Sequence, residues 1–181
     1  MSVSDEVRSR VRRRAGYVCE FCGVTESDTG GELTVDHFQP QSQGGADILD
    51  NLIYAYHRCN QYKLDYWPAN PKAPHLWNPR TEPASLHFIE TLDGFLQPLT
   101  ATGAFTLARL RLNRPSLVAH RQQKHVQAEE SRLLTQYKEL IELHQQLNRQ
   151  LSVLIEEQSQ LLAEQRELLR LLLHRGDSFQ V

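Results

Sequence analysis

The spacing of apolar side chains changes along this chain and predicts two unlike parts. Apolar and other residues alternate over Leu33–His37, as in a half-buried strand, and a second short apolar run follows at Leu52–Tyr54. Helices are expected on either side of these strands, at residues 4–16, with Ser4 as N-cap, and at His57–Tyr66. Residues 1–70 are therefore expected to fold as a small α+β module.

The connections between these elements are marked by polar residues, glycine and proline. Thr25–Gly31 and Gln39–Asp50 are expected to be loops, and most of the prolines lie within residues 68–83, which predicts an extended connection. Asp93-Gly94 between two short apolar runs predicts a β-hairpin, and a short helix is expected at about residues 102–112. Residues 71–114 thus form a connector between two larger elements.

After Pro115, a favourable first helical residue, no glycine or proline occurs until Gly176. One helix over residues 115–175 is expected, about 90 Å long at about 1.5 Å per residue, followed by a tail at 176–181. Leucine recurs at every seventh position, which predicts a left-handed coiled coil. These heptad leucines are Leu133, Leu140, Leu147, Leu154, Leu161 and Leu168.

The apolar face of this helix is wider than a simple two-stranded seam requires. The core positions between the heptad leucines include polar residues, and a second apolar stripe lies beside them. This width favours a bundle of several helices, so residues 116–175 are expected to form a homo-oligomer or to dock a partner protein. The second stripe consists of Leu134, Ile141, Ile155, Leu162 and Leu169.

Composition narrows the classes of protein without choosing one. A formal net charge of -2 gives no overall attraction to nucleic acid, so any basic surface must be local. The three cysteines, two of them in Cys19-x-x-Cys22, fit a metal site in a reducing compartment better than a disulfide framework. The start of the chain lacks the apolar core of a signal peptide, and no apolar run is long enough to span a membrane. We expect a cytoplasmic protein.

Polar residues with complementary chemistry cluster around the expected strand pair. His37 is suited to act as a general base, because neutral imidazole accepts a proton near neutral pH. A carboxylate and an amide oxygen, from Asp36 and Asn60, suit a hard cation such as Mg²⁺ or Mn²⁺. Simple alternation sends Asp36 and His37 to opposite sides of a strand, so a local bend is needed for both to serve one site.

Together, Asp36-His37, Pro40, Gly44-Gly45, Asn51-Leu52 and Cys59-Asn60-x-x-Lys63, in this order after a C-x-x-C, resemble the HNH nuclease family. The variant is the one with asparagine as the third signature residue. The resemblance implies a ββα-metal fold, catalytic metal on the residue matching Asp36, and hydrolysis of DNA to 5′-phosphate and 3′-hydroxyl ends. It also implies that Asn51 holds the long loop. The segment from Leu76 to Pro115 resembles an extension of one bacterial HNH subfamily.

The cysteines are compatible with several kinds of site. Many HNH members carry C-x-x-C twice, whereas here Tyr56 stands at one expected ligand position. Cys19, Cys22 and Cys59 remain, and His57 completes a four-ligand zinc site if it lies close enough. Another fourth ligand, or a metal-free cluster of three cysteines, is an alternative. A redox C-x-x-C lacks the surrounding βαβ pattern.

Contacts to DNA are expected from the few basic residues near the module. Lys63, one turn after Asn60, is a candidate phosphate ligand, and the arginines of the first helix precede the metal module directly. A non-catalytic zinc-knuckle subunit that binds DNA or a partner is the alternative to an endonuclease. A third possibility is that the protein is an effector of a bacterial defence system, in which the coiled coil docks a sensor protein. The arginine candidates are Arg12, Arg13, Arg14 and Arg58.

Overall fold

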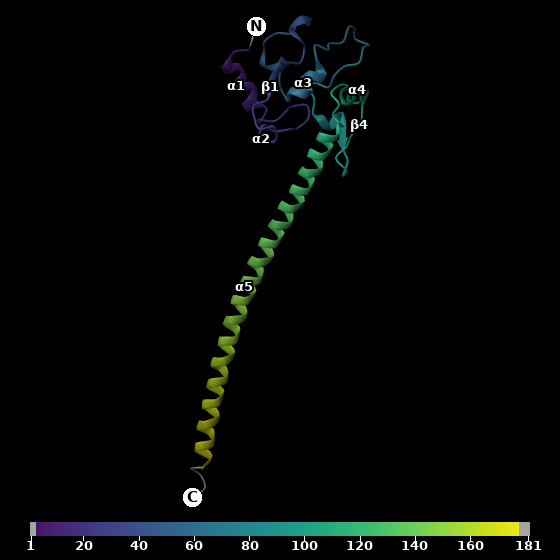
Figure 1. Ribbon diagram of the computed structural model, residues 1–181. Coiled ribbons are helices and arrows are strands. Elements are labelled where there is room, and N and C mark those ends of the chain that lie inside the picture. The colour runs from purple at the N-terminus through teal and green to yellow at the C-terminus, as the bar shows by residue number, and fades with distance from the viewer. Residues whose placement is uncertain (1–2, 178–181) are drawn as a thin grey trace. The chain divides into compact units, whose positions relative to one another are not determined.

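The computed structural model describes residues 3–177, and the side chains of residues 3–172. The chain separates into two units, residues 1–126 and 127–181 (Figure 1). The first unit holds every strand found in residues 3–177 and the first turns of the long helix, and the second unit continues that helix. This arrangement confirms an α+β fold with a long C-terminal helix.

The N-terminal helices are fixed by their caps. Helix α1 (Asp5–Arg14) begins at Ser4, whose hydroxyl accepts a hydrogen bond from the backbone N–H of Val7. A second, short helix α2 (Glu26–Thr29) replaces the polar loop that was expected over Thr25–Gly31. Thr25 and Asp28 form a capping box there, so the local pattern T-x-x-D already contained the signal.

The centre of the first unit is an antiparallel strand pair followed by a helix. Strand β1 (Thr34–His37) pairs with β2 (Leu52–Ala55), with His37 opposite Leu52, and α3 (His57–Lys63) follows directly. The β1–β2 loop contains two short 3-10 turns, Gln41–Gln43 and Leu49–Asn51. Helix α3 ends three residues earlier than expected, because Leu64 adopts a positive φ of 52°.

All four residues of β2 are buried, so both faces of this strand are covered by protein. Helix α1 packs against both strands and α3 packs against β1. The core joins the module to the connector through an edge-to-face contact between Phe21 and Trp77, with ring centroids 6.3 Å apart. Residues 1–70 therefore share one apolar core with the segment that follows them.

The connector folds as the turn signals predicted. Strands β3 (Phe88–Glu90) and β4 (Leu96–Pro98) form a hairpin, a 3-10 turn at Ala84–Leu86 precedes it, and α4 (Ala101–Arg109) follows. Arg121 on the next helix is buried, and its guanidinium donates hydrogen bonds to the carbonyl oxygens of Gly94 and Leu112. The first turns of that helix are thus fixed to the connector.

Helix α5 (Pro115–Asp177) runs without interruption from Pro115, as expected, through the predicted end at residue 175. Part of the expected tail, residues 178–181, lies outside the described residues. Leu117 and Val118 are buried in the first unit, whereas the heptad leucines of the second unit are about half exposed. Within the described residues, no helix is long and apolar enough to cross a membrane.

Candidate active site and thiol cluster

The predicted polar residues lie on β1, on α3 and in the loop that joins β1 to β2. His37 ends β1, and its side chain is 15% exposed. Its Nε2 lies 2.5 Å from Oδ1 of Asp47, a residue of the β1–β2 loop. Among the described residues, no hydrogen bond involves Nδ1 of His37. The imidazole therefore has one nitrogen engaged by a carboxylate and one available for a proton.

Asn51 holds the loop that carries Asp47. Its side-chain amide accepts a hydrogen bond from the backbone N–H of Gln39 (2.8 Å) and donates to the carbonyl oxygens of Gln39 and Ala46. Gly45 permits this close packing, because a Cβ there would lie 1.8 Å from the carbonyl oxygen of Gln39. Asn51 thus has the bracing contacts that the family resemblance implied.

Asp47 is held from a second side as well. Gln41 donates a hydrogen bond of 2.7 Å to the same carboxylate oxygen that contacts His37. The hydrogen bond with His37 lowers the pKa of Asp47, so the carboxylate is ionised at neutral pH.

The side chain of Asp36 has a different partner from that of His37. Its Oδ2 lies 2.9 Å from Nζ of Lys63, which is fully buried. Lys63 also donates to the carbonyl oxygen of His37 at 2.6 Å. The Lys63 ammonium therefore faces the inside of the module and not a surface where a phosphate would pass.

Asp36 and Asn60 retain oxygen atoms with coordinating capacity. Oδ2 of Asp36 is buried, and its charge is paired with the Lys63 ammonium. The side chain of Asn60 is half-buried on α3, one turn before Lys63. A carboxylate and an amide oxygen fit a hard divalent cation, with the Lys63 ammonium as a competing positive charge.

The three cysteines lie close together in the core of the first unit. The sulfur atoms of Cys19, Cys22 and Cys59 all lie within 4.8 Å of one another and are buried. Contact with the Cys19 thiol raises the pKa of Cys22 to about 12, and both neighbouring thiols raise the pKa of Cys59. Three thiols so close do not ionise together without a cation, and a bound Zn²⁺ would supply the charge that displaces their protons.

The fourth corner of the cluster is not completed by His57. No other cysteine, histidine or acidic side chain in the described residues joins the three sulfurs. His57 is two residues from Cys59 on α3, about 200° around the helix, and its exposed ring packs on Tyr56. Nη2 of Arg114 lies 3.8 Å from Sγ of Cys59 instead. The donor set therefore fits three of the four ligands of a structural zinc site.

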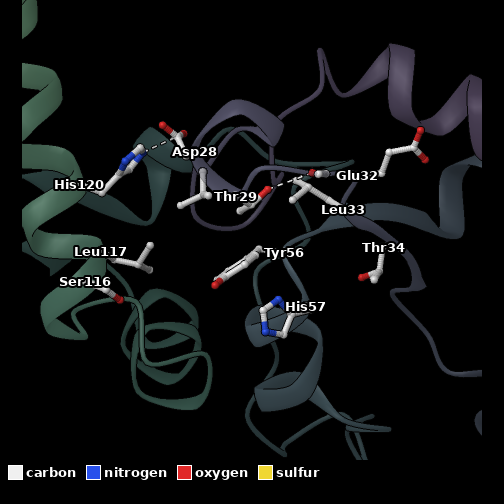
Figure 2. Close-up of a pocket in the computed structure, with 12 residues that line it drawn as sticks. Asp28, Thr29, Glu32, Leu33, Thr34, Tyr56, His57, Ser116, Leu117 and His120 are labelled. Carbon is white, nitrogen blue, oxygen red and sulfur yellow. Dashed lines mark hydrogen bonds and ion pairs between the residues drawn. The ribbon is translucent and has the colours of Figure 1, made fainter.

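A surface cleft of about 430 Å³ adjoins the residues that precede Cys59 (Figure 2). Tyr56 and His57 line one part of it, and His120 of α5 faces Asp28, with 3.7 Å between Nε2 and Oδ2. None of the catalytic candidates His37, Asp36 and Asn60 lines this cleft. The concave surface and the candidate active site are therefore separate features of the unit.

The arginines predicted to contact DNA divide into two groups. Arg12 is paired with Glu26 and Glu32, and Arg14 donates to the carbonyl oxygens of Leu49 and Leu52. These two guanidinium groups hold α1 to α2 and to the strand pair. Arg13 and Arg58 are exposed, and neither side chain has a recorded partner among the described residues.

Sequence reasoning missed residues whose partners are distant in the chain. Asp47 contacts His37 across ten positions, and only its place after Gly44-Gly45 distinguished it from other loop acids. Glu20 accepts hydrogen bonds from Arg80 and from the backbone N–H of Tyr54, and Arg114 reaches Cys59 from the start of α5. No local pattern marked these contacts.

Comparison with known protein families identifies the same region of the chain. Residues 19–65 match the family model described as HNH endonuclease. The match begins at the first cysteine and includes the strand pair, the loop and α3, so the recognised family domain coincides with the site. No curated protein and no solved structure matches the chain. Residues 19–65 thus match the HNH endonuclease family, and the connector and α5 lie outside the match.

Proposed function

We propose that this protein is a metal-dependent endonuclease that hydrolyses phosphodiester bonds of DNA. The observation that carries the proposal is the surrounding of His37. A partly exposed imidazole with one nitrogen on a carboxylate and the other free occurs within the HNH-matched segment. In the proposed reaction, Nδ1 of His37 accepts the proton of the water that attacks the phosphorus atom.

Asp36 and Asn60 are the proposed ligands of the catalytic Mg²⁺ or Mn²⁺. When bound, this ion supplies positive charge at the phosphate and at the leaving 3′ oxygen. Asp36 lies within the HNH-matched segment, and a bound ion there would compete with the Lys63 ammonium that pairs with its Oδ2. In the proposed reaction the water oxygen bonds to phosphorus and the bond from phosphorus to the 3′ oxygen breaks. The 3′ oxygen takes a proton from solvent and leaves as a hydroxyl, and the phosphate remains on the 5′ end.

Lys63 and Asn51 are proposed as positioning residues. Lys63 joins Asp36 to the backbone of His37, so it fixes the end of β1 where the two candidates are adjacent. Asn51 braces the loop that faces His37. We propose that phosphate contacts come from Arg13 and Arg58, whose side chains are exposed, whereas Arg12, Arg14 and Lys63 serve the fold.

The long helix is proposed to join two or more copies of the chain. Its heptad leucines are about half exposed in the second unit, and their repeat matches the geometry by which identical helices pack. One HNH site cuts one strand, so an oligomer converts paired nicks into double-strand breaks. A bacterial cytoplasmic defence system, with a sensor docked on α5, is one setting for such an enzyme.

A second function, a non-catalytic DNA- or partner-binding subunit, is favoured by one specific observation. Tyr56 replaces a zinc ligand of the family pattern, which is a departure expected in a scaffold that has lost activity. Such a protein would bind DNA without cutting it. The presence of His37, Asp36, Asn51 and Asn60 in one module favours the endonuclease.

Plasmid cleavage tests the proposal directly. Supercoiled DNA is incubated with the protein and Mg²⁺, and EDTA is added to a parallel sample. His37→Ala is expected to slow cleavage by about 10²–10⁴-fold, because the general base is lost. His75→Ala, at an exposed histidine of the connector, is the matched control and is expected to cut normally.

DNA affinity and folding are measured on the same samples. Binding of DNA by folded wild-type protein without any cleavage, in Mg²⁺ and in Mn²⁺, would support the binding subunit. Wild-type cleavage rates in pure His37→Ala protein would contradict the assignment of the base.

A further inference from the structure

The contact between His37 and Asp47 was not predicted from the sequence. The described part of the chain contains three other histidine–carboxylate pairs, His87–Glu82, His120–Asp28 and His125–Glu90. Those pairs lie in the connector or join α5 to its neighbours. Only the His37–Asp47 pair lies within the segment that matches the HNH family.

Hydrogen bonding decides which nitrogen of a neutral imidazole carries its single proton. Asp47 is ionised and accepts only, so Nε2 of His37 must be the donor across the 2.5 Å contact. The lone pair then resides on Nδ1, which has no recorded partner among residues 3–172. A carboxylate at this distance also restricts rotation of the ring about its Cα–Cβ and Cβ–Cγ bonds.

Asp47 is itself held in place, unlike an ordinary exposed loop acid. Gln41 donates to the same oxygen, and Asn51 holds the carbonyl oxygen of the preceding residue, Ala46. The turn before it depends on Gly45, where a side chain would collide with Gln39. The loop therefore presents the carboxylate to His37 in a defined position.

We propose that Asp47 is a positioning residue for cleavage, which holds His37 in the Nε2–H tautomer and directs Nδ1 toward the attacking water. This inference rests on the proposed endonuclease function. Asp47 touches neither the DNA nor the reacting atoms in this role and acts through His37. It assigns the β1–β2 loop a part in catalysis that goes beyond spacing the two strands.

The first test compares steady-state cleavage by Asp47→Ala with that of wild type. Loss of the carboxylate is expected to lower kcat about 10–100-fold with little change in KM, the range found for groups that orient metal-bound histidines. Asp47→Asn keeps an oxygen acceptor for Nε2–H and is expected between the two. Asp50→Ala, another exposed acid of the loop without recorded side-chain partners, is the matched control and is expected to match wild type.

The second test reads the ring directly and requires no activity. The proton on Nε2 of His37 is expected to give a downfield imidazole resonance in the NMR spectrum of the full chain, assigned by its loss in His37→Ala. Asp47→Ala should abolish this resonance and Asp50→Ala should keep it. A persistent resonance in folded Asp47→Ala would overturn the inference.

The two tests separate failure of this inference from failure of the function on which it rests. Cleavage by wild type with an unchanged kcat in Asp47→Ala overturns the role of Asp47 and leaves the endonuclease standing. Absence of cleavage by wild type overturns the endonuclease and, with it, any catalytic role for Asp47. Lower kcat together with loss of the resonance supports both.

Discussion

Two regions of the molecule differ in how much of their apolar side chains is exposed. One is the HNH-matched segment, residues 19–65, and the other is α5 beyond Val126. In the former, Leu52, Ile53 and Cys59 have no exposed surface. In the latter, Leu147 is 51% exposed and Leu161 is 58% exposed. Both regions are regular secondary structure, so the difference lies in what covers their apolar faces.

The contrast separates two sources of stability. The first region obtains burial from its own chain, because α1, the connector and the start of α5 surround one strand pair. A single helix has no such cover, and helices in proteins gain most of their stability from packing of an apolar face. The long helix is therefore expected to acquire its cover from other chains, whereas the HNH-matched segment is covered by its own chain.

The largest effect is expected from charges placed on the heptad leucines, which should abolish association of the long helix. Replacing Leu147, Leu154 and Leu161 by Glu removes burial of about 1.5–3 kcal/mol per leucine and puts three charges in an apolar seam. We expect complete dissociation, measured by light scattering at micromolar concentration.

A matched triple variant carries the same charges on the other side of the helix. Gln145→Glu, Ser152→Glu and Ser159→Glu lie two positions before the three leucines, about 200° around the helix. This variant should remain associated. A wild-type protein that is monomeric without a partner would instead assign the stripe to another protein.

Removal of one thiol should unfold the first region and leave the helix unaffected. Cys59→Ser is expected to release zinc and lower the free energy of unfolding by about 4 kcal/mol, as losses of structural metal do. Elemental analysis and thermal denaturation measure the two effects. Tyr56→Cys, which supplies a fourth thiol at the family position, should strengthen zinc retention against chelator. Absence of zinc from protein never exposed to chelator would contradict the knuckle and leave the catalytic proposal intact.

Loss of the Lys63 charge should lower stability by a smaller amount and tests whether Asp36 binds a metal. Lys63→Met keeps much of the buried aliphatic chain but leaves Asp36 without its neighbouring charge. The fold is expected to be less stable without metal and to recover with Mg²⁺, since a divalent ion then replaces the ammonium. Thermal denaturation with and without Mg²⁺ measures this difference. Equal Mg²⁺ dependence in wild type and variant would argue against a metal on Asp36.

The smallest effect is expected on acidification. Hydrogen bonds from Arg12, with a contribution from Tyr54, lower the pKa of Glu26 from its ordinary 4.5. A lowered folded pKa means that this stabilisation is complete above pH 4.5 and is lost as pH falls through the folded value. Glu26→Gln should flatten the dependence of Tm on pH in this window, whereas Glu129→Gln, on the exposed helix, should not. Identical profiles for wild type and Glu26→Gln would remove this ion pair from the stability of the first unit.

The sequence by itself determined the elements whose signals are local. Strand alternation, Ser4 as a cap, the Asp93-Gly94 turn and the uninterrupted run after Pro115 each specify conformation through neighbours in the chain. The order of Asp36-His37, Asn51 and Cys59-Asn60 likewise identified the HNH domain.

Only the tertiary structure decided which side chains meet. Arg12, Arg14 and Lys63 look like solvent-facing cations in the sequence, yet their donors bind groups inside the module. His57 is adjacent to a ligand position but faces away from the thiols, because helical geometry turns it from Cys59. Asp47 becomes a partner of His37 only when the loop closes. Burial and long-range pairing depend on the whole chain, so no local pattern specifies them.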